Sequence, residues 1–172
     1  CIAQGNSAIF FSATLLPIQY FKEMLTGNPE DNAIYAETPF DSNNRRLLIA
    51  NDVSSKYTRR NQREFERIAE YIYCTAKART GNYMVFFPSY KFMQQVYEQF
   101  LPLNLGQMDV CLQESGMRED KREAFLEEFQ QERERSLVAF CVMGGIFSEG
   151  IDLKNEQLIG ALIVGTGLPQ VN

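Results

Sequence analysis

Residues 136–152 read Ser-Leu-Val-Ala-Phe-Cys-Val-Met-Gly-Gly-Ile-Phe-Ser-Glu-Gly-Ile-Asp, an apolar run that leads directly into a glycine-rich loop. A continuous apolar run of this length is typical of a strand buried on both faces, as in a parallel sheet. The glycines allow close backbone approach to a ligand, and the loop ends with two carboxylates, Glu149 and Asp152. We expect these acids to meet a phosphate, ribose, metal or basic side chain; the alternative is a turn with solvated acids.

The same alternation of apolar runs and amphipathic stretches continues in both directions along the chain. It predicts strands at 8–11, 47–50, 83–87, 109–112, 137–142 and 158–164, and helices at 17–25, 61–78, 89–100 and 118–133. Helix starts are expected at Asn61 or a neighbour, at Ser89 or Tyr90, and after Ser115, which is placed to act as a cap. Phenylalanines 10, 11, 86 and 87 lie in strands and are predicted to be buried. The pattern indicates an α/β fold with a mostly parallel sheet covered by helices on both faces, and ligand sites beyond the carboxyl ends of its strands.

Composition narrows the classes of function. The 172 residues suit one domain, and the expected location is cytoplasmic because no apolar run could span a bilayer and no leader is evident. With no histidine and four scattered cysteines, neither a metal centre nor Cys/His catalysis is expected.

Positive charge is concentrated in the middle of an otherwise acidic chain. The net charge is −5, but residues 42–100 hold ten basic side chains against five acidic ones. A local basic patch can contact phosphates despite an acidic total. Arg59 and Arg60 precede a predicted helix and are candidate ligand contacts, whereas Arg63 and Arg67 are expected to pair with glutamates of that helix.

Five blocks in order resemble the second motor domain of the DinG/XPD family of superfamily 2 DNA helicases. They are Phe-Ser-Ala-Thr-Leu at 11–15, Tyr-Thr-Arg-Arg at 57–60, Gly-Asn-Tyr-Met-Val-Phe-Phe-Pro-Ser-Tyr at 81–90, the loop at 144–152, and Ile-Val-Gly-Thr-Gly-Leu-Pro at 163–169. The resemblance spans nearly the whole chain. It implies a single RecA-like three-layer domain over residues 1–172 that forms the C-terminal half of an ATP-dependent helicase moving along DNA from 5′ to 3′.

The resemblance also implies a role for individual residues. Those expected to couple hydrolysis to strand movement are Ser12 and Thr14. Those expected at the ATP cleft are Glu149, Gly150 and Asp152. Those expected to contact single-stranded DNA are Arg60, Ser89, Tyr90 and Gly145.

The sequence lacks parts that such a helicase needs. It contains no Gly-x-x-x-x-Gly-Lys-Ser/Thr loop and no magnesium-binding acidic box. We therefore expect ATP and magnesium to be held mainly by the first motor domain of the same parent chain, and the arginine-finger segment to lie beyond Asn172. This piece alone, with no complete catalytic set, should not hydrolyse ATP.

Two other interpretations stay open. One is a non-catalytic nucleic-acid-binding or interaction module that keeps a motor fold, which the missing phosphate loop and the negative charge favour. The other is an unrelated α/β enzyme, such as a transferase that uses Glu149 or Asp152 as a base.

Overall fold

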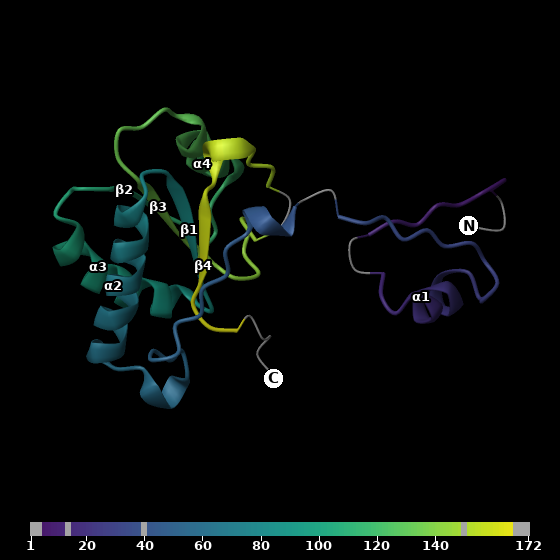
Figure 1. The fold of residues 1–172 in the computed structure, drawn as a ribbon, viewed down its shortest axis with the longest axis horizontal. Helices are drawn as coiled ribbons and strands as arrows, with labels where there is room; N and C mark the ends of the chain where they lie inside the picture. The colour runs from purple at the N-terminus through teal and green to yellow at the C-terminus, as the bar shows by residue number, and fades with distance from the viewer. Residues whose placement is uncertain (1–4, 13–14, 39–40, 149–150, 167–172) are drawn as a thin grey trace. The chain divides into compact units, whose positions relative to one another are not determined.

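The computed structural model describes residues 5–12, 15–38, 41–148 and 151–166. The chain divides into two compact units, residues 1–48 and 49–172 (Figure 1). One motor domain over residues 1–172 remains a prediction. Within the described ranges, no helix has the length and apolar character needed to cross a bilayer.

The first unit contains helix α1 (Ile18–Leu25) and the short helix η2 (Ser42–Asn44). The helix predicted at 17–25 is confirmed, but the strands predicted at 8–11 and 47–50 are wrong, since neither segment is in a strand. Phe10 and Phe11, which were expected to be buried, are 42% and 89% exposed. A short apolar segment becomes a strand only when a neighbour takes up its backbone hydrogen bonds, and neither segment belongs to the hydrogen-bonded sheet of the described residues.

The second unit holds the sheet. Its elements in order are η3 (Tyr57–Arg59), α2 (Gln62–Ala78), β1 (Asn82–Phe87), α3 (Tyr90–Asn104), β2 (Asp109–Leu112), α4 (Glu119–Glu127), η4 (Glu128–Gln130), β3 (Leu137–Val142), η5 (Asn155–Gln157) and β4 (Gly160–Ile163). The strand order is β2-β3-β1-β4 and every pairing is parallel. The four strands predicted from 83–87 onward are therefore confirmed.

Helices cover both faces of this sheet, as predicted (Figure 1). Val85, Phe87, Val138 and Phe140 alternate along β1 and β3 and pack against α2 and α3 in one core. The residues between them face the other way: Met84, Leu137, Ala139 and Cys141 pack in a second core with Phe125 of α4 and Phe129 of η4. The period of two along each strand divides one apolar run between two cores. Phe86 is partly buried against the second core, and Phe87 is fully buried.

Local capping explains two helix starts. The side chain of Asn61 accepts a hydrogen bond from the Glu64 N–H at 3.1 Å, which confirms the predicted cap of α2. Ser89 caps α3 in the same way. The cap predicted at Ser115 is wrong, because α4 begins at Glu119 and ends at Glu127, well short of 133. Its highly charged sequence provides little apolar face to extend it.

Burial predicts which thiols resist modification. Burial raises the pKa of the Cys111 thiol to about 12 and raises that of Cys141 as well, whereas Cys74 is exposed. The thiolate is the reactive form, so iodoacetamide at pH 8 is expected to alkylate Cys74 in the folded protein and to spare the other two until denaturant is added. Peptide mass spectrometry with and without urea measures this. Early labelling of Cys141 would contradict the packing of β3.

Candidate functional site

A pocket of about 260 Å³ lies where the start of α3 meets the segment before α2. Its lining residues are Tyr57, Arg60, Phe65, Ser89, Lys91, Phe92 and Gln95. Two residues singled out in the sequence, Arg60 and Ser89, thus lie in one site. They meet because α2 and α3 pack side by side on one face of the sheet.

Arg60 is held in this pocket by three contacts. Its Nε donates to the Ser55 carbonyl at 3.0 Å. Its guanidinium carbon lies 4.4 Å from the centre of the Phe92 ring and 5.8 Å from that of Tyr57, within the range of cation–π attraction. No carboxylate pairs with Arg60 among the residues that the structure describes. These contacts therefore hold the guanidinium in place without neutralising its positive charge.

Buried Glu64 fixes the segment that carries Arg60. Its carboxylate accepts from the Ser54 N–H at 2.9 Å and from Arg59 Nη2 at 2.5 Å. Because the Ser54 N–H and then Arg59 stabilise its charged form, the pKa of Glu64 is lowered. Arg59 is therefore engaged by Glu64, and Arg60 is the better candidate for a ligand contact.

Arg67 forms an ion pair that differs from the predicted one. Arg67 pairs with Asp52, and not with a glutamate of its own helix. The Tyr71 hydroxyl donates to the same Asp52 carboxylate at 2.7 Å and, as the main cause, lowers its pKa. The segment before α2 lies against this helix face, so the tertiary partner is nearer than the helical neighbours.

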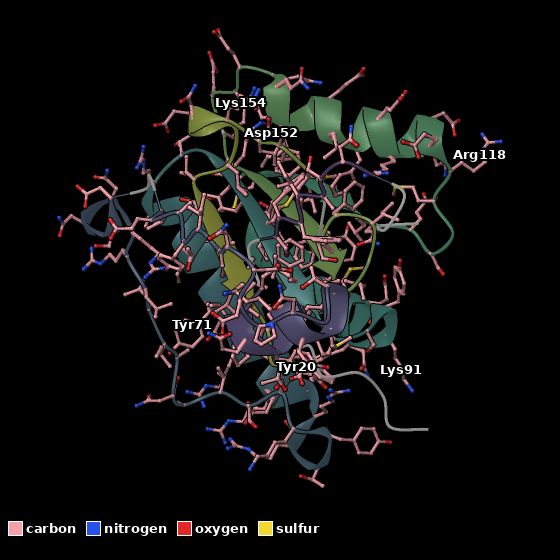
Figure 2. All side chains as sticks on the ribbon, turned by 90° about the vertical axis from the view of Figure 1, so that its right-hand side faces the viewer. Tyr20, Tyr71, Lys91, Arg118, Asp152 and Lys154 are labelled. Atoms are coloured by element: carbon pink, nitrogen blue, oxygen red, sulfur yellow. The ribbon has the colours of Figure 1, made fainter. Side chains whose placement is uncertain are left out.

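The opposite wall of the pocket is the first turn of α3. Ser89 Oγ accepts from the Phe92 N–H at 3.3 Å, and its hydroxyl hydrogen can still be donated. Lys91 is exposed and has no ion-pair partner in the described chain; Figure 2 shows its side chain pointing away from the ribbon. Helix N-termini favour anions. Two cations, a hydroxyl and this helix start suit a phosphate group.

Tyr90 and Gly145 both lie against Gln113, which follows β2 and for which the sequence predicted no individual role. Gln113 Oε1 accepts from the Val142 N–H at 2.9 Å, and Gln113 Nε2 donates to the Tyr90 hydroxyl at 3.0 Å. The Tyr90 hydroxyl in turn donates to the Glu114 carbonyl at 3.4 Å. A glutamine at the end of a strand gives no signal of this role in the sequence, because its partners come from two other elements.

The turn after β3 is anchored by Phe147. Its ring is buried and stacks on Phe125 of α4, with the ring centres 4.2 Å apart. Gly144 has φ +69°, a backbone conformation that favours glycine. The first residues of the glycine-rich loop thus form a packed turn. The sequence indicated the glycines of this turn but not the role of Phe147 in anchoring it.

Asp152 lies apart from the pocket. Ile151 and Leu153 pack against the second core, so the residue between them points outward and is 80% exposed in its side chain. Its carboxylate is 3.4 Å from Lys154 Nζ. Figure 2 shows both side chains together, well separated from Lys91.

The remaining predicted residues are divided between the two parts of the chain. Ser12 belongs to the first unit. Thr14, Glu149 and Gly150 lie outside the described residues. Asp152 is the described member of the expected ATP-cleft set, and its role stays a prediction.

A larger hollow, about 600 Å³, lies at the amino-terminal edge of β1 around Gly81 and Asn82. Its three cations are already paired: Arg133 with Asp109 and Glu128, Arg135 with Asp109, and Lys154 with Asp152. Paired cations attract an anion less than free ones. Electrostatics therefore favours the smaller pocket as the site for a phosphate. Within the described ranges, no cluster of three His, Cys, Asp or Glu side chains could hold a metal ion.

The second unit is a parallel sheet covered by helices on both faces, and the pocket lined by Arg60 and Ser89 lies beyond the carboxyl end of β1. This architecture is that of a RecA-like α/β domain. The chain belongs to the helicase C-terminal domain family, whose family model matches residues 72–172. Within that family it is of the XPD/DinG type of superfamily 2.

Two curated relatives align with almost the whole chain. A probable ATP-dependent helicase of Methanocaldococcus jannaschii is 24% identical, over 96% of this chain and 25% of its own length. The ATP-dependent DNA helicase CHL1 of Eremothecium gossypii is 25% identical, over 99% of this chain and 22% of its own. The chain thus spans about a quarter of the length of these relatives.

Solved structures agree with the fold. The chain described as XPD_APO has a TM-score of 0.51 and 28% identity, over 69% of this chain and 23% of its own length. A second, XPD_Helicase, has a TM-score of 0.50 and 26% identity, over 69% of this chain and 20% of its own.

Proposed function

We propose that this domain is the C-terminal motor half of an ATP-dependent 5′–3′ DNA helicase, and that the pocket lined by Arg60, Ser89 and Lys91 holds the backbone of single-stranded DNA. The observation that carries the proposal is that two cations, neither ion-paired within the part of the chain that the structure describes, line one pocket with the start of α3. Phosphates are the part of a DNA strand that every sequence presents. A translocating helicase needs such sequence-independent contacts.

The chemistry of the pocket around Arg60 fits a phosphate, whereas the Tyr57 ring at its rim is 84% exposed and leaves a face open to a base. The Phe92 ring is buried and already covered by the Arg60 guanidinium. It therefore offers no open face for stacking, which base recognition in single strands uses. Charge-assisted bonds from Arg60 and Lys91, with a bond from the Ser89 hydroxyl, would hold two phosphate oxygens.

The nucleotide would bind at the other end of the second unit, between this domain and the first motor domain of the parent chain. Asp152 is exposed there, and with Glu149 and Gly150 it would sense the nucleotide across that cleft. Magnesium bound with ATP neutralises charge on the phosphates during transfer. ATP and magnesium would be held mainly by the first motor domain, so the contribution of this chain is to report cleft closure to the strand.

Removal of both cations tests the interface. The double variant Arg60→Ala/Lys91→Ala is expected to bind fluorescein-labelled oligo(dT) at least about tenfold more weakly, because two charge-assisted contacts are lost. The negative slope of log affinity against log salt concentration should become shallower by about 1.4, or about 0.7 for each single-strand phosphate contact that is lost. Fluorescence anisotropy between 50 and 200 mM salt measures both.

The matched control is Lys77→Ala/Arg79→Ala, which removes the same charge at the opposite end of α2. It should leave the affinity within about twofold and the salt slope nearly unchanged, since distant exposed charges contribute little. Equal weakening by both variants would show a diffuse charge effect and would overturn the interface. Thermal unfolding of each variant checks that the loss of the Arg60–Phe92 contact has not unfolded the domain.

A further inference from the structure

Gln113 is a buried polar side chain whose two amide atoms are both used. It is 3% exposed, at the residue after β2. The Oε1 atom accepts from the Val142 N–H, and the Nε2 atom donates to the Tyr90 hydroxyl. A buried amide that lost these partners would keep the full cost of leaving water. The arrangement therefore specifies one position for each partner.

The backbone after β3 packs against the same amide. A Cβ atom on Gly145 would lie 2.6 Å from Gln113 Nε2 and 2.9 Å from the Val142 carbonyl oxygen. Real side chains do not approach this closely, so the turn can lie against Gln113 only because residue 145 has none. One side chain thus contacts the ends of β2 and β3 and the first residue of α3.

We infer that Gln113 is a positioning residue that locks Tyr90 and the turn at Gly145 into one arrangement, so that both loops present a single binding surface to DNA. This deepens the proposed function and rests on it. Without the lock, Tyr90 and the turn would sample other positions. The apparent affinity for a strand would then fall with the fraction of molecules in the competent arrangement.

The test uses the full-length helicase and oligo(dT). Gln113→Leu is expected to raise the oligo(dT) concentration that half-stimulates ATP hydrolysis by about fivefold, the equivalent of one hydrogen bond. The rate at saturating DNA should fall by less than about twofold, because excess strand restores the competent arrangement. A variant that had merely lost structure would lower that maximal rate and the melting temperature together.

Two further variants isolate the mechanism. Tyr90→Phe removes only the hydroxyl and should reproduce most of the Gln113→Leu shift, and the double variant should add less than about twofold to it. Tyr90→Phe keeps the inference testable even where Gln113→Leu does not fold.

The matched control is a tyrosine–glutamine pair away from the site. The Tyr73 hydroxyl donates to Gln107 Oε1 at 2.9 Å, and Gln107→Leu should leave the DNA dependence unchanged. The inference would be overturned if the effects of Gln113→Leu and Tyr90→Phe were additive, or if Gln113→Leu showed a normal DNA dependence. Either result would leave the proposed interface standing. Failure of Arg60→Ala/Lys91→Ala to weaken binding would instead overturn the proposed interface.

Discussion

Replacement of Asp152 by alanine in the full-length helicase is expected to reduce DNA-stimulated ATP hydrolysis by about a hundredfold, the usual effect of removing one preorganised electrostatic contact. Binding of single-stranded DNA should change little, because Asp152 lies far from Lys91 and the pocket (Figure 2). A coupled ATPase assay with and without oligo(dT), beside anisotropy measurements, separates the two effects.

Glu156→Ala provides the matched control. Glu156 is an exposed acid four residues further along, and it pairs with Arg79 at 3.0 Å. Its removal causes the same change in charge and should leave ATP hydrolysis intact. Normal turnover of the Asp152 variant would eliminate its assigned role at the nucleotide, and full loss in both variants would point to a general effect of charge.

Replacement of Phe140 by alanine is expected to lower the free energy of unfolding by about 3–5 kcal/mol, the range for a fully buried phenylalanine. Phe140 is 0% exposed on the central strand β3. Its ring stacks on Phe87 at 5.7 Å and meets Tyr97 and Phe100 edge-on at 5.3 and 5.4 Å. The cavity would therefore open where the sheet joins α3. Urea unfolding followed by circular dichroism measures the loss.

Leu101→Ala is the control for this change. Leu101 is an apolar residue of α3 that is 46% exposed, so its truncation should cost less than about 1 kcal/mol. Similar losses in the two variants would mean that Phe140 is not at the centre of the core. Since α3 carries Ser89 and Lys91 at its start, the Phe140 variant should also bind DNA more weakly near its melting temperature.

Much of the second unit was predictable because its signals are local. The apolar runs at 83–87, 109–112 and 137–142 indicated buried parallel strands, and Asn61 and Ser89 indicated helix starts. The strand predictions at 8–11 and 47–50 were wrong because the same kind of short apolar run has no intrinsic means of pairing.

The site was predictable only in part. Arg60 and Ser89 were recognised one by one, but their shared pocket depends on the packing of α2 against α3. Arg59 was a candidate ligand contact like Arg60, and the structure pairs it with Glu64. Arg67 was expected to pair with a glutamate of its own helix, and the structure pairs it with Asp52. The sequence does not distinguish an arginine in an internal ion pair from one available to a ligand, because the partner comes from another segment of the fold.

The sequence by itself determined the class of fold, because hydrophobic periodicity and helix caps act over a few residues and can be recognised in one segment. It also predicted that the glycine-rich loop at 144–152, which follows a buried strand, carries chemistry, and that role stays a prediction. Only the tertiary structure decided that Gln113 joins Tyr90 to the turn at Gly145, and that Phe147 anchors this turn on α4. These contacts connect segments far apart in the chain, and their energies depend on distances that no local pattern encodes.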